Sequence, residues 1–199
     1  MRSTLRSKGQ GEEGNVLLDG GLVSVQWYDE ADLAALVRVH ATCYPTEAWT
    51  ADDFRRFSEK PGQVVRSIVA GNGRVIGSML YRMSAHEARI ARVAVLPKYR
   101  RQGVATYAVR TLTGLRSPCR KEVCSARLRE HDVASQLFLS SLGFSKTSTK
   151  AGYYKDAKIL VGGEILVTDE DAYVFRYERP MVVARRRRQR RAVEAVTWP

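Results

Sequence analysis

The sequence predicts one α/β (α+β) domain, built on a single mixed, mostly antiparallel sheet of about seven strands with helices on both faces. Three observations predict it. Short β-branched segments and amphipathic segments alternate in the order β-α-α-β-β-β-α-β-α-β-β. A Gly-Asn-Gly turn at residues 71–73 joins two apolar strands into a hairpin. An apolar strand, a basic turn and a helix follow one another over residues 88–115.

The start of the chain lacks the periodic spacing of apolar residues that marks a helix or a strand. Residues 1–22 are polar and Gly-rich, which predicts a disordered tail. This segment has no apolar region of a secretory signal, and no run in the sequence approaches the ~20 apolar residues of a membrane span. The three cysteines (Cys43, Cys119 and Cys124) are odd in number and follow no metal spacing. These observations predict a cytoplasmic protein that binds no metal and no membrane.

The first strand and two helices are predicted between residues 23 and 57. Residues 23–27 alternate as in a strand, and Asp29 can cap the helix that follows it. That helix has an apolar face (Leu33, Leu36, Val37 and His40) and ends before Pro45. Thr50, followed three residues later by Asp53, resembles a capping box and begins a second short helix.

The middle of the chain predicts three strands and the helix behind them. Residues 64–70 and 75–83 form the hairpin, in which Gly77 suits a β-bulge. Residues 90–96 are β-branched and apolar, as in a buried strand, and Pro97 ends them. The helical pattern that follows places Val104, Tyr107, Ala108 and Leu112 on one face.

The last third predicts the remaining strands and one helix. Strands are expected at 123–128, 144–154 and 172–177, with a helix over 133–142 that Gly143 closes. An extra segment at about 155–168 resembles an added hairpin. We therefore expect a domain over residues 23–180, followed by an Arg-rich tail over 181–199.

The basic turn has a clear chemical use. A helix N-terminus has unpaired N–H groups and a partial positive charge, both of which suit a phosphate. Gly103 allows the backbone to approach an anion, Ala105 keeps the next turn small, and Arg100 and Arg101 add positive charge. The stretch matches neither the G-x-G-x-x-G nor the Walker pattern. By itself it could also be an ordinary surface turn with arginines.

A resemblance to a known family favours the phosphate-binding interpretation of this turn. The pattern V-x-V-x-P-x-[YF]-R-x-x-G-x-A, present from Val93 to Ala105, resembles the acetyl-CoA pyrophosphate loop of the GNAT acyltransferases. Within that family the chain is most similar to bacterial ribosomal-protein-alanine N-acetyltransferases. The similar stretches are Cys43 to Trp49, Val93 to Pro97, Asp132 to Phe144, Gly152 to Tyr154 and Glu170 to Tyr173. The resemblance implies transfer of acetyl from acetyl-CoA to the N-terminal amino group of a ribosomal protein, in a GNAT fold.

The resemblance also implies which residues hold acetyl-CoA. The backbone of Val93, Ala94 and Val95 is expected to pair with the pantetheine arm as an added strand would. The diphosphate is expected to bind the following turn and helix start, which comprise Arg100, Arg101, Gln102, Gly103, Val104, Ala105 and Thr106. Asp132 lies where the family has an Asn that contacts the cofactor.

Two catalytic positions of the family differ in this sequence. Aligned from Gly143, the general-acid Tyr falls on Leu139 and the general-base Glu falls on Arg127. Tyr154 and Glu47 are the candidates for the missing roles, as proton donor to the leaving thiolate and as the group that holds the amine. The alternatives are a sheet tyrosine that packs on a helix and a solvated loop carboxylate.

The net charge of +12 predicts an anionic partner. Half of that number comes from six arginines within residues 185–191, which could dock on RNA or the ribosome or could belong to a solvated tail. Two other functions stay open: acetylation of a small-molecule amine, and a catalytically silent module that binds CoA or RNA.

Overall fold

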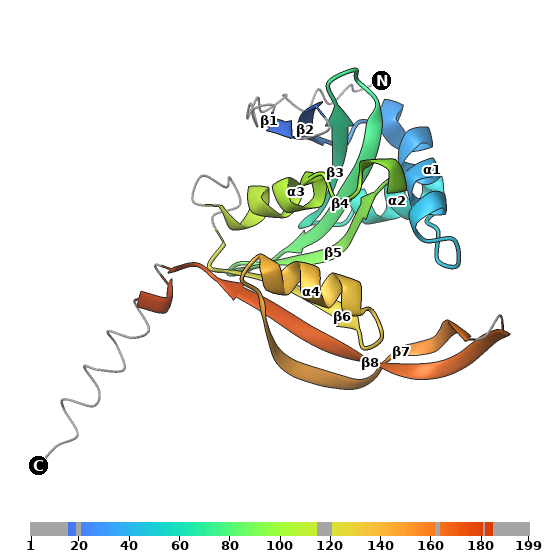
Figure 1. The fold of residues 1–199 in the computed structure, drawn as a ribbon, viewed down its shortest axis with the longest axis vertical. Helices are drawn as coiled ribbons and strands as arrows, with labels where there is room; N and C mark the ends of the chain where they lie inside the picture. The colour runs from blue at the N-terminus through green and yellow to red at the C-terminus, as the bar shows by residue number, and fades with distance from the viewer. Residues whose placement is uncertain (1–15, 19–20, 115–120, 162–163, 181, 185–199) are drawn as a thin grey trace, which may run out of the picture.

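One eight-stranded sheet forms the centre of the protein. The structure is a computed structural model that describes residues 16–18, 21–114, 121–161, 164–180 and 182–184. The strand order is β1-β2-β3-β4-β5-β6-β8-β7, and every neighbouring pair is antiparallel except β5 with β6 (Figure 1). The strands are β1 Val16–Leu18, β2 Gly21–Trp27, β3 Gln63–Ala70, β4 Val75–Met83, β5 Glu87–Val95, β6 Val123–Arg129, β7 Ser145–Val161 and β8 Glu164–Glu178. The predicted mixed, mostly antiparallel sheet is confirmed.

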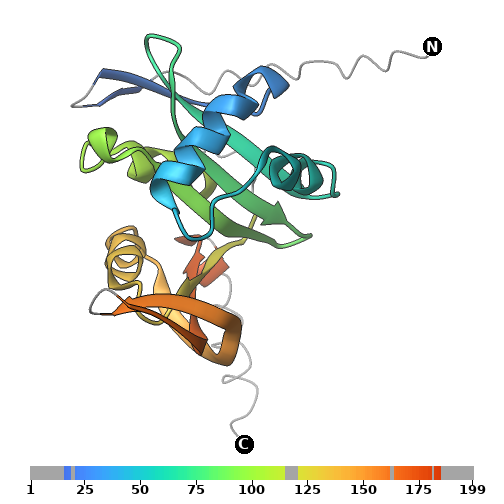
Figure 2. The same cartoon turned by 90° about the vertical axis from the view of Figure 1, so that its right-hand side faces the viewer.

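Helices cover both faces of this sheet. Helices α1 (Leu33–Cys43) and α2 (Ala51–Ser58) pack on one face, where Leu36, Val39 and Phe54 meet the side chains of β3 and β4. Helix α3 (Val104–Thr113) and helix α4 (Val133–Ser141) lie on the other face, as Figure 2 shows. Their core residues include Val109, Leu112 and Leu139. Two 3₁₀ turns, η1 (Glu30–Asp32) and η2 (Pro97–Tyr99), precede α1 and α3. No helix in the described ranges is both long and apolar enough to cross a bilayer.

The predicted cap residues are present at α2 and α4, but Asp29 does not cap α1 itself. Asp29 accepts a hydrogen bond from the N–H of Ala31, but the turn it caps is η1, so α1 begins only at Leu33. Thr50 and Asp53 form the reciprocal capping box of α2. Gly143 has φ +88° directly after α4, in the left-handed conformation that closes many helices.

Gly77 is needed where β4 meets β5. The β3–β4 register shifts next to it, from Ile68 opposite Gly77 to Val69 opposite Val75, so the predicted bulge is present. A Cβ atom at Gly77 would lie 2.5 Å from the carbonyl oxygen of Ala94. Only glycine lets β5 approach this closely.

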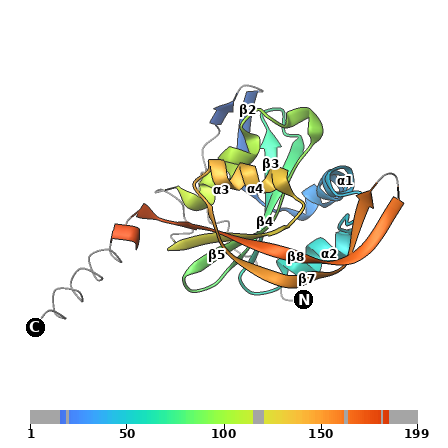
Figure 3. The same cartoon turned by 60° about the horizontal axis from the view of Figure 1, so that its bottom comes forward.

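The ends of the domain differ from the sequence prediction. Residues 16–18 and 21–27 are strands β1 and β2, because they pair in antiparallel order with each other and with β3. Residues 16–18, 21 and 22 of the predicted tail are therefore strand, and residues 1–15 lie outside the described residues. The predicted extra hairpin is the far half of one long hairpin, in which Val161 of β7 pairs with Glu164 of β8 (Figure 3). The arginines of 185–191 also lie outside the described residues.

Candidate functional site

Strands β5 and β6 separate part-way along their length. They pair only from Glu87 to Ile90 and from Val123 to Ala126, and their ribbons then part in Figure 1. The β4–β5 register shifts at the same place, from Tyr81 opposite Ile90 to Leu80 opposite Arg92, so Ala91 is an extra residue in β5. We call the divergence of Arg92–Val95 from Arg127–Arg129 the splay. It leaves one edge of each strand without a partner strand.

The open edge of β5 presents backbone groups to the splay. Leu96 donates its N–H to Ile76 at 2.9 Å, so alternate residues of β5 bond to β4. Val93 and Val95 therefore turn their N–H and C=O groups to the open side, whereas Ala94 is bonded to β4. The carbonyl of Val93 accepts the Tyr44 hydroxyl at 2.6 Å. The edge can accept a chain of amides as it would accept another strand.

The turn before α3 has the geometry of an anion site. Gly103 is the N-cap of α3 at φ +80°, and no side chain caps the first N–H groups of that helix. Arg101, at φ 62°, is the sole non-glycine residue with positive φ among those described. Left-handed residues within a tight turn, here separated by Gln102, help to gather backbone N–H groups into a concave anion site. A Cβ at Gly103 would meet nothing nearer than Leu18 at 3.6 Å, so space remains for a ligand.

The side chains of this turn hold it against β5. Arg100 donates its Nε to the carbonyl of Val95 at 2.9 Å, and Gln102 donates its Nε2 to the carbonyl of Lys98 at 2.9 Å. Val104 is buried in the core, and Ala105 and Thr106 are half-buried in the first turn of α3. The uncapped helix start, next to the open edge of β5, fits a diphosphate joined to an amide-containing arm, as in coenzyme A.

Comparison with known families agrees with this geometry. Residues 33–144, more than half of the chain, match the model of the "Acetyltransferase (GNAT) family". The chain belongs to the GNAT acetyltransferase family. It is therefore an acetyl-CoA-dependent N-acetyltransferase, and its fold is the GNAT fold. Comparison with curated proteins gave no match.

Solved GNAT structures share this fold at low sequence identity. The Escherichia coli ribosomal-protein-S18-alanine N-acetyltransferase is 18% identical, with a TM-score of 0.64 over 78% of this chain and 93% of that one. Naa20 of Chaetomium thermophilum, in complex with a bisubstrate analogue, is 20% identical, with a TM-score of 0.63 over 81% and 90%. A GNAT acetyltransferase of Elizabethkingia anophelis with acetyl-CoA bound is 12% identical, with a TM-score of 0.60 over 78% and 97%.

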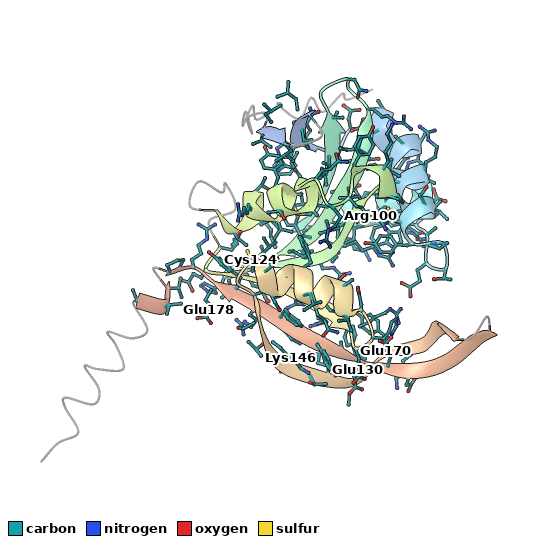
Figure 4. All side chains as sticks on the ribbon, in the orientation of Figure 1. Arg100, Cys124, Glu130, Lys146, Glu170 and Glu178 are labelled. Atoms are coloured by element: carbon teal, nitrogen blue, oxygen red, sulfur yellow. The ribbon has the colours of Figure 1, made fainter. Side chains whose placement is uncertain are left out.

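Charged side chains of this GNAT protein link the two sides of the splay. Glu47, in the loop between α1 and α2, accepts from Arg92 of β5 at 3.2 Å and also pairs with Arg129 of β6. Arg129 in turn pairs with Glu170 of β8 at 2.9 Å. Figure 4 shows Arg100 on the β5 side and Glu170 on the β8 side. Glu47 thus bridges strands that have no backbone pairing at this level.

Glu170 is the buried member of this network. Burial alone would raise its pKa, but the backbone N–H of His131 and the guanidinium of Arg129 hold the pKa below its usual range. His131 Nδ1 lies 2.5 Å from the Glu170 carboxylate. Glu170 therefore anchors Arg129, and through it Glu47, at the mouth of the splay.

Tyr154 places its hydroxyl on the open edge of β6. Glu130 donates its N–H to Asp171 of β8, and because backbone groups alternate along a strand, Arg127 turns its backbone groups to the splay. The Tyr154 hydroxyl donates to the Arg127 carbonyl at 3.2 Å. Burial raises the pKa of Tyr154, which the Arg129 guanidinium, 4.3 Å from its ring, partly opposes. Tyr154 and Glu47 therefore both lie at the splay, although they come from distant parts of the sequence.

Other candidate positions have structural roles. Leu139, which aligns with the family's general acid, is 4% exposed in the core beneath α4. Asp132 is the N-cap of α4 and accepts from the N–H of Ser135 at 3.0 Å. Sequence reasoning missed the role of Tyr44, whose pKa burial raises to about 12. The aromatic residue before Pro45 was the available signal. Among the described residues no group of acidic, His and Cys side chains could hold a metal.

His40 gives a test of the packing beneath the α1–α2 loop. Its ring is fully buried, its Nε2 lies 3.0 Å from Ser78 Oγ, and its Nδ1 has no partner among the described residues. Burial, followed by the charge of Arg92, lowers the pKa of His40 to about 4. The unfolded chain therefore takes up this proton at a higher pH than the native protein does.

We expect this difference to make the protein less stable as pH falls. The contribution of neutral His40 to the free energy of unfolding is present above pH 6.5 and is lost toward pH 4. Between pH 7 and pH 5 we expect the free energy of unfolding to fall by about 2 kcal/mol for this reason. Urea unfolding at the two pH values measures it, and His40→Gln should remove about that much of the pH dependence. A native His40 that titrates near pH 6 by NMR would contradict the prediction.

Proposed function

We propose that this GNAT protein transfers acetyl directly from acetyl-CoA to the N-terminal amino group of a protein. The observation that supports this most is the splay, where the open edge of β5, the hydroxyl of Tyr154 and the α1–α2 loop meet. Two of the similar structures are described as a ribosomal-protein-S18-alanine N-acetyltransferase and as Naa20 with a bisubstrate analogue. A peptide N-terminus is a linear group that suits an opening between two strand edges.

In this proposal the chain contributes mainly orientation and polar groups. Acetyl-CoA, when bound, supplies the acetyl group as an activated thioester. The turn from Arg100 to Thr106 holds the diphosphate, and the edge formed by Val93 and Val95 aligns the pantetheine arm. Fixing both reactants in this way contributes up to about 7–11 kcal/mol in well-oriented systems. The N–H of Val95 faces the splay and can stabilise negative charge on the carbonyl oxygen.

Two side chains take the proton-transfer roles. As the amine nitrogen bonds to the thioester carbonyl carbon and the C–S bond breaks, Tyr154 would donate its hydroxyl proton to the leaving thiolate and regain a proton from water. Glu47 would hold the incoming amine while water takes the proton of the amine. Arg127 cannot replace the family's basic Glu, because a guanidinium has no acceptor and stays protonated. The reaction therefore depends more on positioning than on a strong base.

A thiol-release assay tests the proposal. Acetyl-CoA is combined with N-terminal peptides in one panel and with polyamines, amino sugars and amino acids in another. We expect turnover with peptides to exceed turnover with the small amines, and acetylation at the α-amino group by mass spectrometry. Faster turnover of a small amine would show that the acceptor belongs to that class of small amines and is not a peptide. CoA binding without turnover of any peptide or small amine would contradict the proposed substrate.

Docking on RNA or the ribosome stays a prediction from charge. The arginines of 185–191 that motivate it lie outside the described residues. RNA binding that falls with salt, and that deletion from Arg185 onward abolishes, would support it. The cytoplasmic location likewise stays a prediction from the sequence.

A further inference from the structure

The side of the splay that faces α1 and α2 is rich in arginine. Arg92 lies between the rings of Tyr44 and Trp49, at 4.9 and 5.3 Å from their centroids. Arg127 and Arg129 project to this same side of β6, because Arg129 reaches Glu47 in the α1–α2 loop and Arg127 is two residues away. The start of α3, which suits the diphosphate, lies on the opposite face of the sheet. These arginines are therefore placed for the acceptor.

Two of the three arginines are neutralised within the protein. Arg92 is paired with Glu47, and Arg129 is paired with both Glu47 and Glu170. The guanidinium of Arg127 is different. It donates to the hydroxyl of Tyr153 at 2.6 Å and stacks 4.8 Å above that ring, and no carboxylate of the described residues lies within ion-pair distance of it. Of the three arginines on this side, Arg127 is therefore the one whose positive charge no described carboxylate pairs, and this charge is left for a ligand.

The position of Arg127 fixes which part of an acceptor it would meet. Its own carbonyl holds the hydroxyl of Tyr154, which we place beside the leaving thiolate. The guanidinium is therefore one side-chain length away from the reacting amine. Tyr153 holds it in place through the hydroxyl and ring contacts. A planar guanidinium held in this way binds a carboxylate through two parallel hydrogen bonds.

We propose that the acceptor is a peptide whose second residue carries a side-chain carboxylate, and that Arg127, oriented by Tyr153, binds this carboxylate. This inference rests on the proposed function, for which it names the substrate class: peptides with an acidic residue at the second position. Glu47 and Glu170 do not prevent such binding, since Arg92, Arg129 and His131 already surround them.

Matched peptides test the inference. Two peptides identical except for Asp or Asn at the second residue are titrated by calorimetry into the CoA-saturated protein, and kcat and KM are measured by thiol release. We expect the Asp peptide to bind about 10-fold more tightly and to have a lower KM. Arg127→Gln should reduce the preference to about 2-fold or less, mainly through KM. Tyr153→Phe, which keeps the charge, should reduce it in part.

A matched control separates local binding from overall charge. Arg74→Gln removes one exposed positive charge at the β3–β4 turn, which contributes no residue to the contacts of Arg127, and should keep the preference for Asp. Equal binding of both peptides by the wild-type protein, or a preference that survives both Arg127→Gln and Tyr153→Phe, would overturn the inference. If neither peptide is acetylated, the proposed function fails, but the calorimetric comparison still decides whether Arg127 binds the carboxylate.

Discussion

Gly103→Asp is expected to lower the affinity for CoA by about 100-fold, which is about 2.7 kcal/mol. The new carboxylate would compete for the uncapped N–H groups at the start of α3 and would repel the diphosphate. Like charges about 4 Å apart repel by about 4 kcal/mol near a protein surface, and salt lowers that figure. Calorimetric titration with CoA measures the loss.

Gly73→Asp is the matched control for this change. Gly73 has φ +79° in the β3–β4 turn, almost the same φ as Gly103, and a Cβ there would meet nothing within 4 Å. Both variants should fold with a similar loss of about 1–2 kcal/mol from the left-handed conformation. We expect Gly73→Asp to bind CoA like the wild-type protein. Equal CoA affinity in the two variants would show that the diphosphate does not bind at the start of α3.

Tyr154→Phe is expected to lower kcat by about 100-fold with little change in CoA affinity. The hydroxyl at the open edge of β6 is the proposed proton donor to the thiolate, and a general acid contributes about 10²–10⁴-fold in rate. The phenylalanine keeps the aromatic ring, so we expect the stacking of this ring with the Arg129 guanidinium to persist and the protein to fold normally. Steady-state kinetics with a saturating peptide separate kcat from KM.

Tyr177→Phe controls for the loss of a tyrosine hydroxyl. Tyr177 lies on β8, and its ring packs against Phe144 at 5.5 Å, on the face that α4 covers. We expect this variant to keep the wild-type kcat. Unchanged kcat in Tyr154→Phe would remove Tyr154 from the mechanism. Solvent would then be the source of the proton for the leaving thiolate. A raised KM with normal kcat would instead make Tyr154 part of peptide binding.

The sequence by itself determined the features that depend on neighbouring residues. Thr50 and Asp53 form their capping box three residues apart, and Gly143 ends α4 directly after it. The strand, turn and helix from Val93 to Thr106 are continuous in the chain, so their pattern alone predicts an anion site there. Hydrophobic period and cap residues act over one or two turns, which is why they can be recognised without a structure.

The tertiary structure decided what the splay contains. Glu47 meets Arg129 across 82 residues, and Tyr154 reaches the carbonyl of Arg127 across 27. Which backbone groups of β5 face the opening depends on strand register and on the extra residue Ala91, and a shift by one residue would turn Val93 and Val95 away. No local pattern encodes that register, because it is set by the packing of helices and strands from the whole chain.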